Sequence, residues 1–165
     1  MAVEQMRLSP EFALVQALGT VPVLHTLGAA GPYQDDEVKV AALQPKKDWS
    51  PPFCFYIPTE DEEDRDLNGP CGLQHFAAQL HFVGGSHRGM QQLCQLAKKA
   101  IREMPGAVYM TPYNTEDWPR GSILVEDANL QQSSPDLYET GVGLYRRIYM
   151  VRLDFQTQEV FQDDD

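Results

Sequence analysis

The segment from Gln74 to Met104 constrains the fold more than any other part of this chain, because a strand pattern passes directly into a helix pattern. Residues 74–82 alternate in polarity, as in a strand that buries one face. That face is predicted to carry Gln74, Phe76, Ala78, Leu80 and Phe82. Gly84-Gly85 then ends the strand, and Ser86 is placed to cap a helix. We therefore expect a sheet with a helix packed against it.

The helix that follows Ser86 is the most regular pattern in the sequence. Its apolar residues recur at helical spacing, which predicts one buried face. They are Met90, Leu93, Cys94, Ala97, Ala100, Ile101 and Met104. Lys98, Lys99 and Arg102 fall in the last turns, where cations suit the helix dipole, and Pro105-Gly106 ends the helix.

The remaining elements are shorter and are separated by loops. Ser9-Pro10-Glu11 predicts the start of a first helix, which Gly19 can close. We expect strands at 53–57, 107–110 and 122–126, and a long final strand over 143–158 that bends or carries a bulge. Residues 21–47 are expected to be loop with one short strand, and polar loops are expected between 111 and 121 and over 127–139.

The order of these elements predicts the fold class. We expect an α+β fold with a largely antiparallel sheet of four to five strands, two main helices and long loops. A length of 165 residues suits one domain, 1–165, with an acidic C-terminal tail at 162–165.

An acidic segment lies between the strands at 53–57 and 74–82. We expect residues 59–72 to form a hairpin loop rich in carboxylates, namely Glu60, Asp61, Glu62, Glu63, Asp64 and Asp66. Asp64, Asp66, Asn68 and Gly69 match the first half of an EF-hand calcium loop. The twelfth position of such a loop requires a bidentate glutamate, but here that position is His75, a poor calcium ligand. Both flanking segments are expected to be strands rather than helices. We therefore expect a solvated acidic turn without a metal.

The other chemistry-bearing residues form no recognisable site in the sequence. His75 and His81 lie six residues apart on one strand face, too far to share a metal, and each histidine is expected to be hydrogen-bonded or solvent-facing. Cys54, Cys71 and Cys94 form no CxxC pair and are expected to be reduced thiols, mostly in the core. No nucleophile elbow, phosphate loop or dinucleotide fingerprint is present, so we expect neither an enzyme nor a cofactor site.

The charge and hydropathy of the chain exclude other classes. A formal net charge of −11 disfavours tight binding to nucleic acid but suits a surface past which DNA slides. Apolar runs are too short to span a bilayer, and the N-terminal residues lack the apolar segment of a secretory signal. We expect no membrane partner.

Three segments together resemble a known family. They are "PPFCFYIP" followed by the charged segment, "GLQHFAAQLHFVGGSHRGMQQLCQLAKKAI", and the closing "LYRRIYMVRLDFQ". This order of elements, over residues 9–156, is similar to the tail-completion proteins of long-tailed bacteriophages, which comprise tail terminators and tail-to-head joining proteins. The likeness lies in the pattern of elements rather than in a diagnostic motif.

The resemblance implies a small α+β subunit that forms a ring, commonly a hexamer, in the virion neck after assembly in the host cytoplasm. The ring would terminate the tail tube and contact the tail-tube protein and a head-completion or connector protein, while DNA passes non-specifically through its lumen. The acidic segment from Glu60 to Asp66 would face the lumen or an assembly interface. The alternatives are an interaction module or assembly chaperone that forms no ring, and, less favoured, a hydrolase with a non-standard site.

Overall fold

The computed structural model describes residues 10–25, 38–66, 69–110 and 121–159, with side chains except in 60–72 and 158–159. Two helices, α1 (Glu11–Leu18) and α2 (His87–Arg102), and a short 3-10 helix η1 (Pro22–Leu24) accompany the sheet. The strands in chain order are β1 (Val40–Ala42), β2 (Phe53–Asp66), β3 (Gly69–Gly84), β4 (Val108–Met110), β5 (Gly121–Gln132), β6 (Leu137–Glu139) and β7 (Leu144–Glu159).

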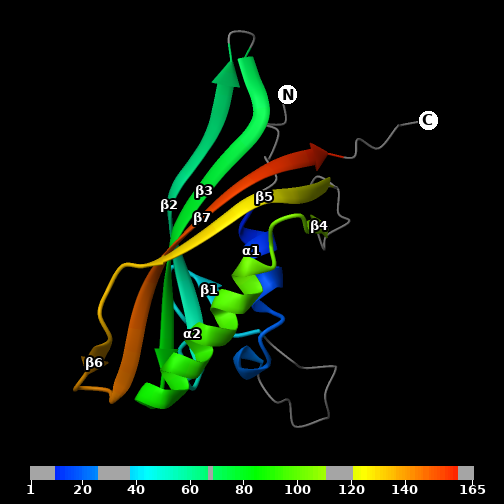
Figure 1. Ribbon diagram of the computed structural model, residues 1–165. Helices are drawn as coiled ribbons and strands as arrows, with labels where there is room; N and C mark the ends of the chain where they lie inside the picture. Colours follow the sequence, from blue (N-terminus) through cyan, green and yellow to red (C-terminus); the bar gives the residue numbers. More distant parts are fainter. Residues whose placement is uncertain (1–9, 26–37, 67–68, 111–120, 160–165) are drawn as a thin grey trace, which may run out of the picture.

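The strands form one sheet in the order β1-β2-β3-β7-β5-β4, and β6 also pairs with β7. Strand β7 lies at the centre, with β3 along one side and β5 and then β6 along the other. All pairings are antiparallel except that of β1 with β2, which is parallel. Figure 1 shows the sheet strongly curved, with the β2–β3 hairpin reaching well beyond the helices.

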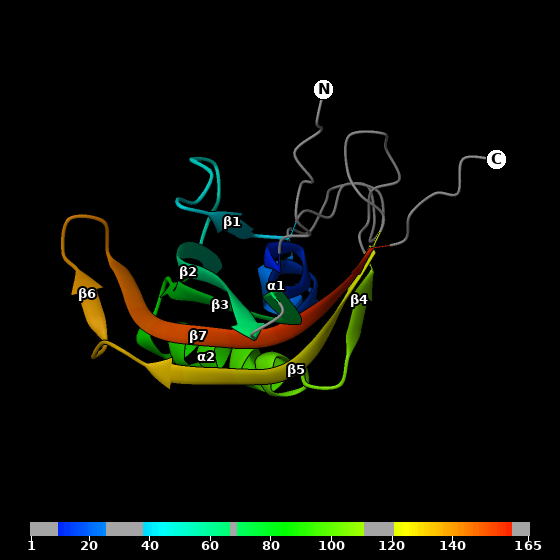
Figure 2. The same ribbon diagram turned by 90° about the horizontal axis from the view of Figure 1, so that it is seen from above.

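Helix α2 packs on one face of the sheet, and the main core lies between them. From the sheet, Phe82, Tyr149, Val151 and Phe155 are buried, and from α2, Leu93 and Ile101 have no exposed surface. Figure 2 shows α2 running beneath β7 and β5. Helix α1 covers the rest of the same core with Ala13, Leu14, Ala17 and Leu18.

The start of α2 is fixed by its sequence, as predicted. Ser86 is the N-cap, and its hydroxyl accepts a hydrogen bond from the Gly89 N–H at 3.0 Å. Gly84 brings the end of β3 so close to this first turn that a Cβ there would lie 2.6 Å from the Met90 backbone nitrogen. The glycine is therefore required by the close approach of strand and helix.

The predicted class is confirmed in its main outline, two helices against a largely antiparallel sheet, but the sheet is larger and mixed. It has seven strands where four to five were expected, and β1 runs parallel to its neighbour. The expected strand within 21–47 is β1, and the first helix begins at Glu11, after Pro10. Ser9, the loop at 111–120 and the tail at 162–165 lie outside the described residues.

Two predicted loops are wrong, for the same physical reason. The acidic segment 59–72 is mostly strand, because β2 and β3 stay paired as far as Asp66 opposite Gly69. The polar stretch 127–139 holds the second half of β5 and all of β6, both paired with β7. In each case hydrogen bonds to a neighbouring antiparallel strand override a polar local composition. The expected irregularity of the final strand appears on its partner, since β5 shifts register between Val125 and Asp127.

Gly84→Ala is expected to lower the free energy of unfolding by about 1–3 kcal/mol, because the new methyl group would overlap the Met90 backbone. Gly85→Ala is the matched control, since its Cβ would meet only the Pro51 ring at 3.4 Å. Its effect should stay within about 0.5 kcal/mol. Urea unfolding monitored by circular dichroism measures both, and equal midpoints for the two variants would contradict the close-approach argument.

Candidate assembly surfaces

The predicted acidic residues lie on the outer half of β2. Glu60, Asp61, Glu62 and Glu63 pair in register with Ala77, Phe76, His75 and Gln74 of β3, and Asp66 pairs with Gly69. The register shifts between Pro58 and Glu60 and again between Glu63 and Arg65, so Asp64 sits at an irregularity. The acidic residues are therefore spread along a long two-stranded ribbon. Residues 67–68 at its tip, which include Asn68 of the EF-hand-like pattern, lie outside the described residues.

The outer edge of this ribbon is open. Strand β1 pairs with β2 only from Cys54 to Tyr56, and no strand that the structure describes pairs with the same side of β2 between Ile57 and Asp66. The other arm leaves the sheet as well, since the pairing of β3 with β7 begins only at Leu73. Figure 1 shows the ribbon diverging from β5 and β7. An unpaired strand edge offers N–H and C=O groups to a further strand.

A second open edge lies on the far side of the sheet. Strand β4 pairs with β5 only at Ser122, Ile123 and Leu124. Within the described chain, no strand pairs with the outer side of β5 from Glu126 to Gln132. The residues Asn129–Gln132 at the end of this edge are uncharged. This edge falls within the stretch that the sequence predicted as a loop.

Two cations of α2 lie beside the β5 edge. Lys98 and Arg102 line a cavity of about 310 Å³ together with Asn129, Leu130 and Gln132 of β5. The Lys98 ammonium also lies 5.1 Å above the Tyr149 ring, a cation–π contact that directs it toward the sheet. The chain thus carries an acidic open edge on β2 and an open edge on β5 that begins with Glu126 and Asp127 and ends in uncharged residues beside two cations of α2.

The hairpin of β6 and β7 presents a small apolar surface. Leu137, Tyr138 and Val142 are exposed here, by 37%, 53% and 65%. Asp136 holds the base of the hairpin, accepting hydrogen bonds from Arg147 at 2.5 and 3.0 Å and lying 2.8 Å from His87 Nε2. The Arg147 guanidinium, followed by His87, lowers the pKa of Asp136 to about 2, so this carboxylate stays ionised at neutral pH.

Three of the four histidines have polar neighbours, as predicted. His75 Nδ1 lies 2.6 Å from an Asp154 carboxylate oxygen, His87 contacts Asp136, and His25 Nε2 lies 2.5 Å from the Gly19 carbonyl. Within the described ranges, no group of three or more His, Cys, Asp or Glu side chains could hold a metal ion. Within the described residues, each helix is too short or too polar to span a bilayer.

His81 contradicts the expectation that each histidine is hydrogen-bonded or solvent-facing. Its side chain is 6% exposed, and neither ring nitrogen has a hydrogen-bond partner. The ring stacks on Phe55, with centroids 4.4 Å apart, on the face of the sheet away from α2. Burial, and then the positive charge of Arg146, lower the pKa of His81. Alternation placed His81 correctly on the second face, but this end of β3 is buried on both faces, as Val83 is buried too.

The two cysteines with described side chains are buried thiols, as predicted. Cys54 and Cys94 have no exposed surface and form no disulfide. Burial raises the pKa of Cys94 to about 11 and raises the pKa of Cys54 further. Both are therefore protonated and poor nucleophiles at neutral pH. The side chain of Cys71 lies outside the described residues.

His81→Phe is expected to remove part of the pH dependence of stability. Because the folded-state pKa of His81 is lowered, the unfolded chain binds the extra proton, and stability falls as the pH drops below about 6.5. One such proton contributes at most about 1.4 kcal/mol per pH unit. Urea midpoints at pH 5.5 and 7.5 should differ less for His81→Phe than for the native protein. An unchanged difference would mean that His81 finds a partner in solution.

Comparison with known proteins gives a likeness in structure alone. No protein-family model matches the chain, and no curated protein matches it. Among solved structures, the chain is similar to one from a structure described as "Virion of native gene transfer agent (GTA) particle", with a TM-score of 0.43 and 11% identity. The alignment covers 92% of this chain and 89% of that one. The protein is thus weakly similar, over nearly its whole length, to a chain of a virion particle.

Proposed function

We propose that this protein is a structural virion protein of a tailed bacteriophage, and that its copies form a ring that terminates the tail tube and joins it to the head connector. The observation that carries the proposal is the pair of open strand edges on opposite sides of one sheet, acidic on β2 and flanked by cations on β5. Two different surfaces that fit each other make a head-to-tail contact, which closes into a ring when the rotation allows it.

Strand addition supplies the contact in this proposal. The β2 edge of one copy pairs with the β5 edge of the next, so that main-chain hydrogen bonds continue from sheet to sheet. The carboxylates from Glu60 to Asp66 then lie beside Lys98 and Arg102 of the neighbouring copy. Since each copy carries a net charge of −11, local pairing of opposite charges must offset a general repulsion between copies.

The remaining features suit a ring that meets other proteins at its two ends. The exposed apolar residues Leu137, Tyr138 and Val142 lie at one end of the sheet, and Val108 and Met110 lie on β4 at its edge. We assign these surfaces to contacts with the tail-tube protein and with the head-completion or connector protein. The acidic character of the copies would keep DNA from adhering as it passes. The protein acts without catalysis or a cofactor in this proposal.

The principal alternative is an interaction module or assembly chaperone that uses the same open edges for a different protein and forms no ring. Mass measurement of the purified protein, alone and with tail tubes, separates the two: a persistent monomer that ignores tubes supports the module. A hydrolase is less favoured because the buried Cys94, whose pKa is raised to about 11, is not an activated nucleophile.

Replacing both flanking cations, Lys98→Glu with Arg102→Glu, is expected to disrupt the ring. Each exposed charge pair contributes about 0.2–1 kcal/mol, and reversal replaces attraction with repulsion. The dissociation constant between neighbouring copies should therefore rise about tenfold. Sedimentation velocity at 0.15 M salt measures the loss. Arg88→Glu is the matched control, because Arg88 is exposed near the other end of α2 and the change alters charge in the same sense. Equal behaviour of both variants would argue against a contact at the β5 edge.

Reversing the acidic strand, by changing Glu60, Asp61, Glu62, Glu63 and Asp64 to Lys, separates an interface role from a lumen role. If these residues lie at the interface, the variant fails to assemble alone but regains ring mass when combined in one chain with Lys98→Glu and Arg102→Glu. If they face the lumen, the variant forms rings and retains DNA during delivery. Normal assembly together with normal DNA delivery would mean that the acidic strand has neither role.

A further inference from the structure

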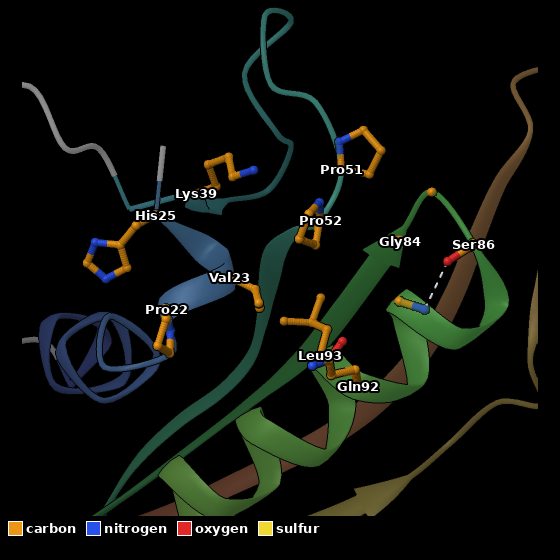
Figure 3. A pocket seen from close by; sticks show the side chains of 12 residues that line it. Pro22, Val23, His25, Lys39, Pro51, Pro52, Gly84, Ser86, Gln92 and Leu93 are labelled. Atoms are coloured by element: carbon orange, nitrogen blue, oxygen red, sulfur yellow. Dashed lines mark hydrogen bonds between the residues drawn. The ribbon is translucent and has the colours of Figure 1, made fainter. Parts of the chain in front are cut away.

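A cavity of about 610 Å³ lies away from both open edges, where η1, the start of β1, the Pro51-Pro52 segment and the first turns of α2 meet. Figure 3 shows Lys39 and His25 on one side of it, Gly84 and Ser86 on the other, and Leu93 and Gln92 at its base. This volume is in the range of sites that hold small molecules. The ring proposal assigns no role to this cavity.

Lys39 is the unusual residue of this cavity, because it is a cation with almost no exposed surface. Its relative exposure is 8%, and its backbone is fixed on both sides: its N–H donates to the Leu24 carbonyl and its own carbonyl accepts from the Cys54 N–H. The ammonium donates one hydrogen bond, to the Ser50 carbonyl at 3.0 Å. In the part of the chain that the structure describes, no carboxylate forms an ion pair with it.

Among the described residues the Lys39 ammonium has one acceptor, the Ser50 carbonyl, so two of its three N–H donors have no partner there. Burial of a cation without a counter-ion is costly, and the lowered pKa of Lys39 follows from that burial. A bound anion would satisfy both the charge and the unmatched donors. The cavity therefore contains a group whose chemistry calls for a negatively charged ligand.

The walls of the cavity restrict what that ligand can be. The first turn of α2 contributes the positive end of a 16-residue helix beside Gly85 and Ser86. Pro22, Val23, Pro51, Pro52 and Leu93 make most of the surface apolar. Among the described residues that line the cavity, Lys39 is the only lysine, arginine, aspartate or glutamate. One cation and a partial helix charge match a monoanion on an apolar body better than a phosphate dianion.

We propose that this cavity binds a compact apolar carboxylate, with the Lys39 ammonium and the α2 N-terminus holding the carboxylate and the proline and leucine walls holding the hydrocarbon part. Such a group can come from a free organic acid or from the C-terminal carboxylate of a protein chain ending in an apolar residue. The site lies within one copy of the protein, so its existence does not depend on ring formation.

The test uses the full-length protein and phenylacetate as the probe, measured by isothermal titration calorimetry up to about 10 mM, a concentration suited to a weak small ligand. We expect saturable binding of phenylacetate, at least tenfold weaker binding of neutral phenylacetamide, and a similar tenfold loss with Lys39→Met. Lys47→Met removes an exposed lysine outside the cavity and should bind as the native protein does. Inorganic phosphate should bind more weakly than phenylacetate.

A second variant and a second ligand complete the test. Val23→Trp should fill the cavity and abolish binding while Lys39 itself is left unchanged. This variant keeps the test valid if Lys39→Met fails to fold. A tetrapeptide ending in free phenylalanine, compared with its amidated form, distinguishes a protein terminus from a free acid. Absence of saturable binding, or equal binding by the native protein and Lys39→Met, would overturn the proposal. Sedimentation of the same samples keeps this result separate from ring assembly.

Discussion

The antiparallel pairing of β7 on both of its sides is the interaction on which the rest of this structure depends. The strand pairs with β3 from Tyr145 to Gln156, and with β5 from Tyr149 to Glu159. Its inner face places Tyr149, Val151, Leu153 and Phe155 against the core. Because those side chains also form the floor on which α2 packs, sheet and helix are stabilised by the same strand.

The sheet has open edges because the strands that cover its two sides, β1 and β4, are short. A strand of 16 residues is much longer than β1 and β4, which cover only three residues each of β2 and β5. The long central strands therefore extend beyond their covering partners on both sides. Edge exposure is a hazard for a monomer, and charged residues are one way in which proteins limit it. On β2 the charges are concentrated on the open stretch, and this combination supports a selective partner rather than general aggregation.

The two buried polar side chains His81 and Lys39 differ in what surrounds them. His81 is buried among the strands without a hydrogen-bond partner, and its effect is on stability at low pH. Lys39 is buried beside a cavity, so its unmatched donors can be reached by a ligand. The difference lies in the available space: stacking against Phe55 closes the surroundings of His81, whereas the meeting of four elements leaves room next to Lys39.

Several elements follow from signals within short stretches of the sequence. The Ser86 cap, the buried face of α2 and the alternation in β3 and β7 follow from side-chain spacing, because helix and strand periods fix which residues share a face. The sequence places Glu60–Asp66 in a hairpin between two strands, which is confirmed, but their polar composition predicts a loop. Strand pairing in the folded chain makes them a strand with an open edge and extends β5 through Gln132 beside Lys98 and Arg102. Packing buries Lys39 and His81. These features depend on pairing and packing between different strands and helices, and the polarity of one segment alone does not show which partner it will meet.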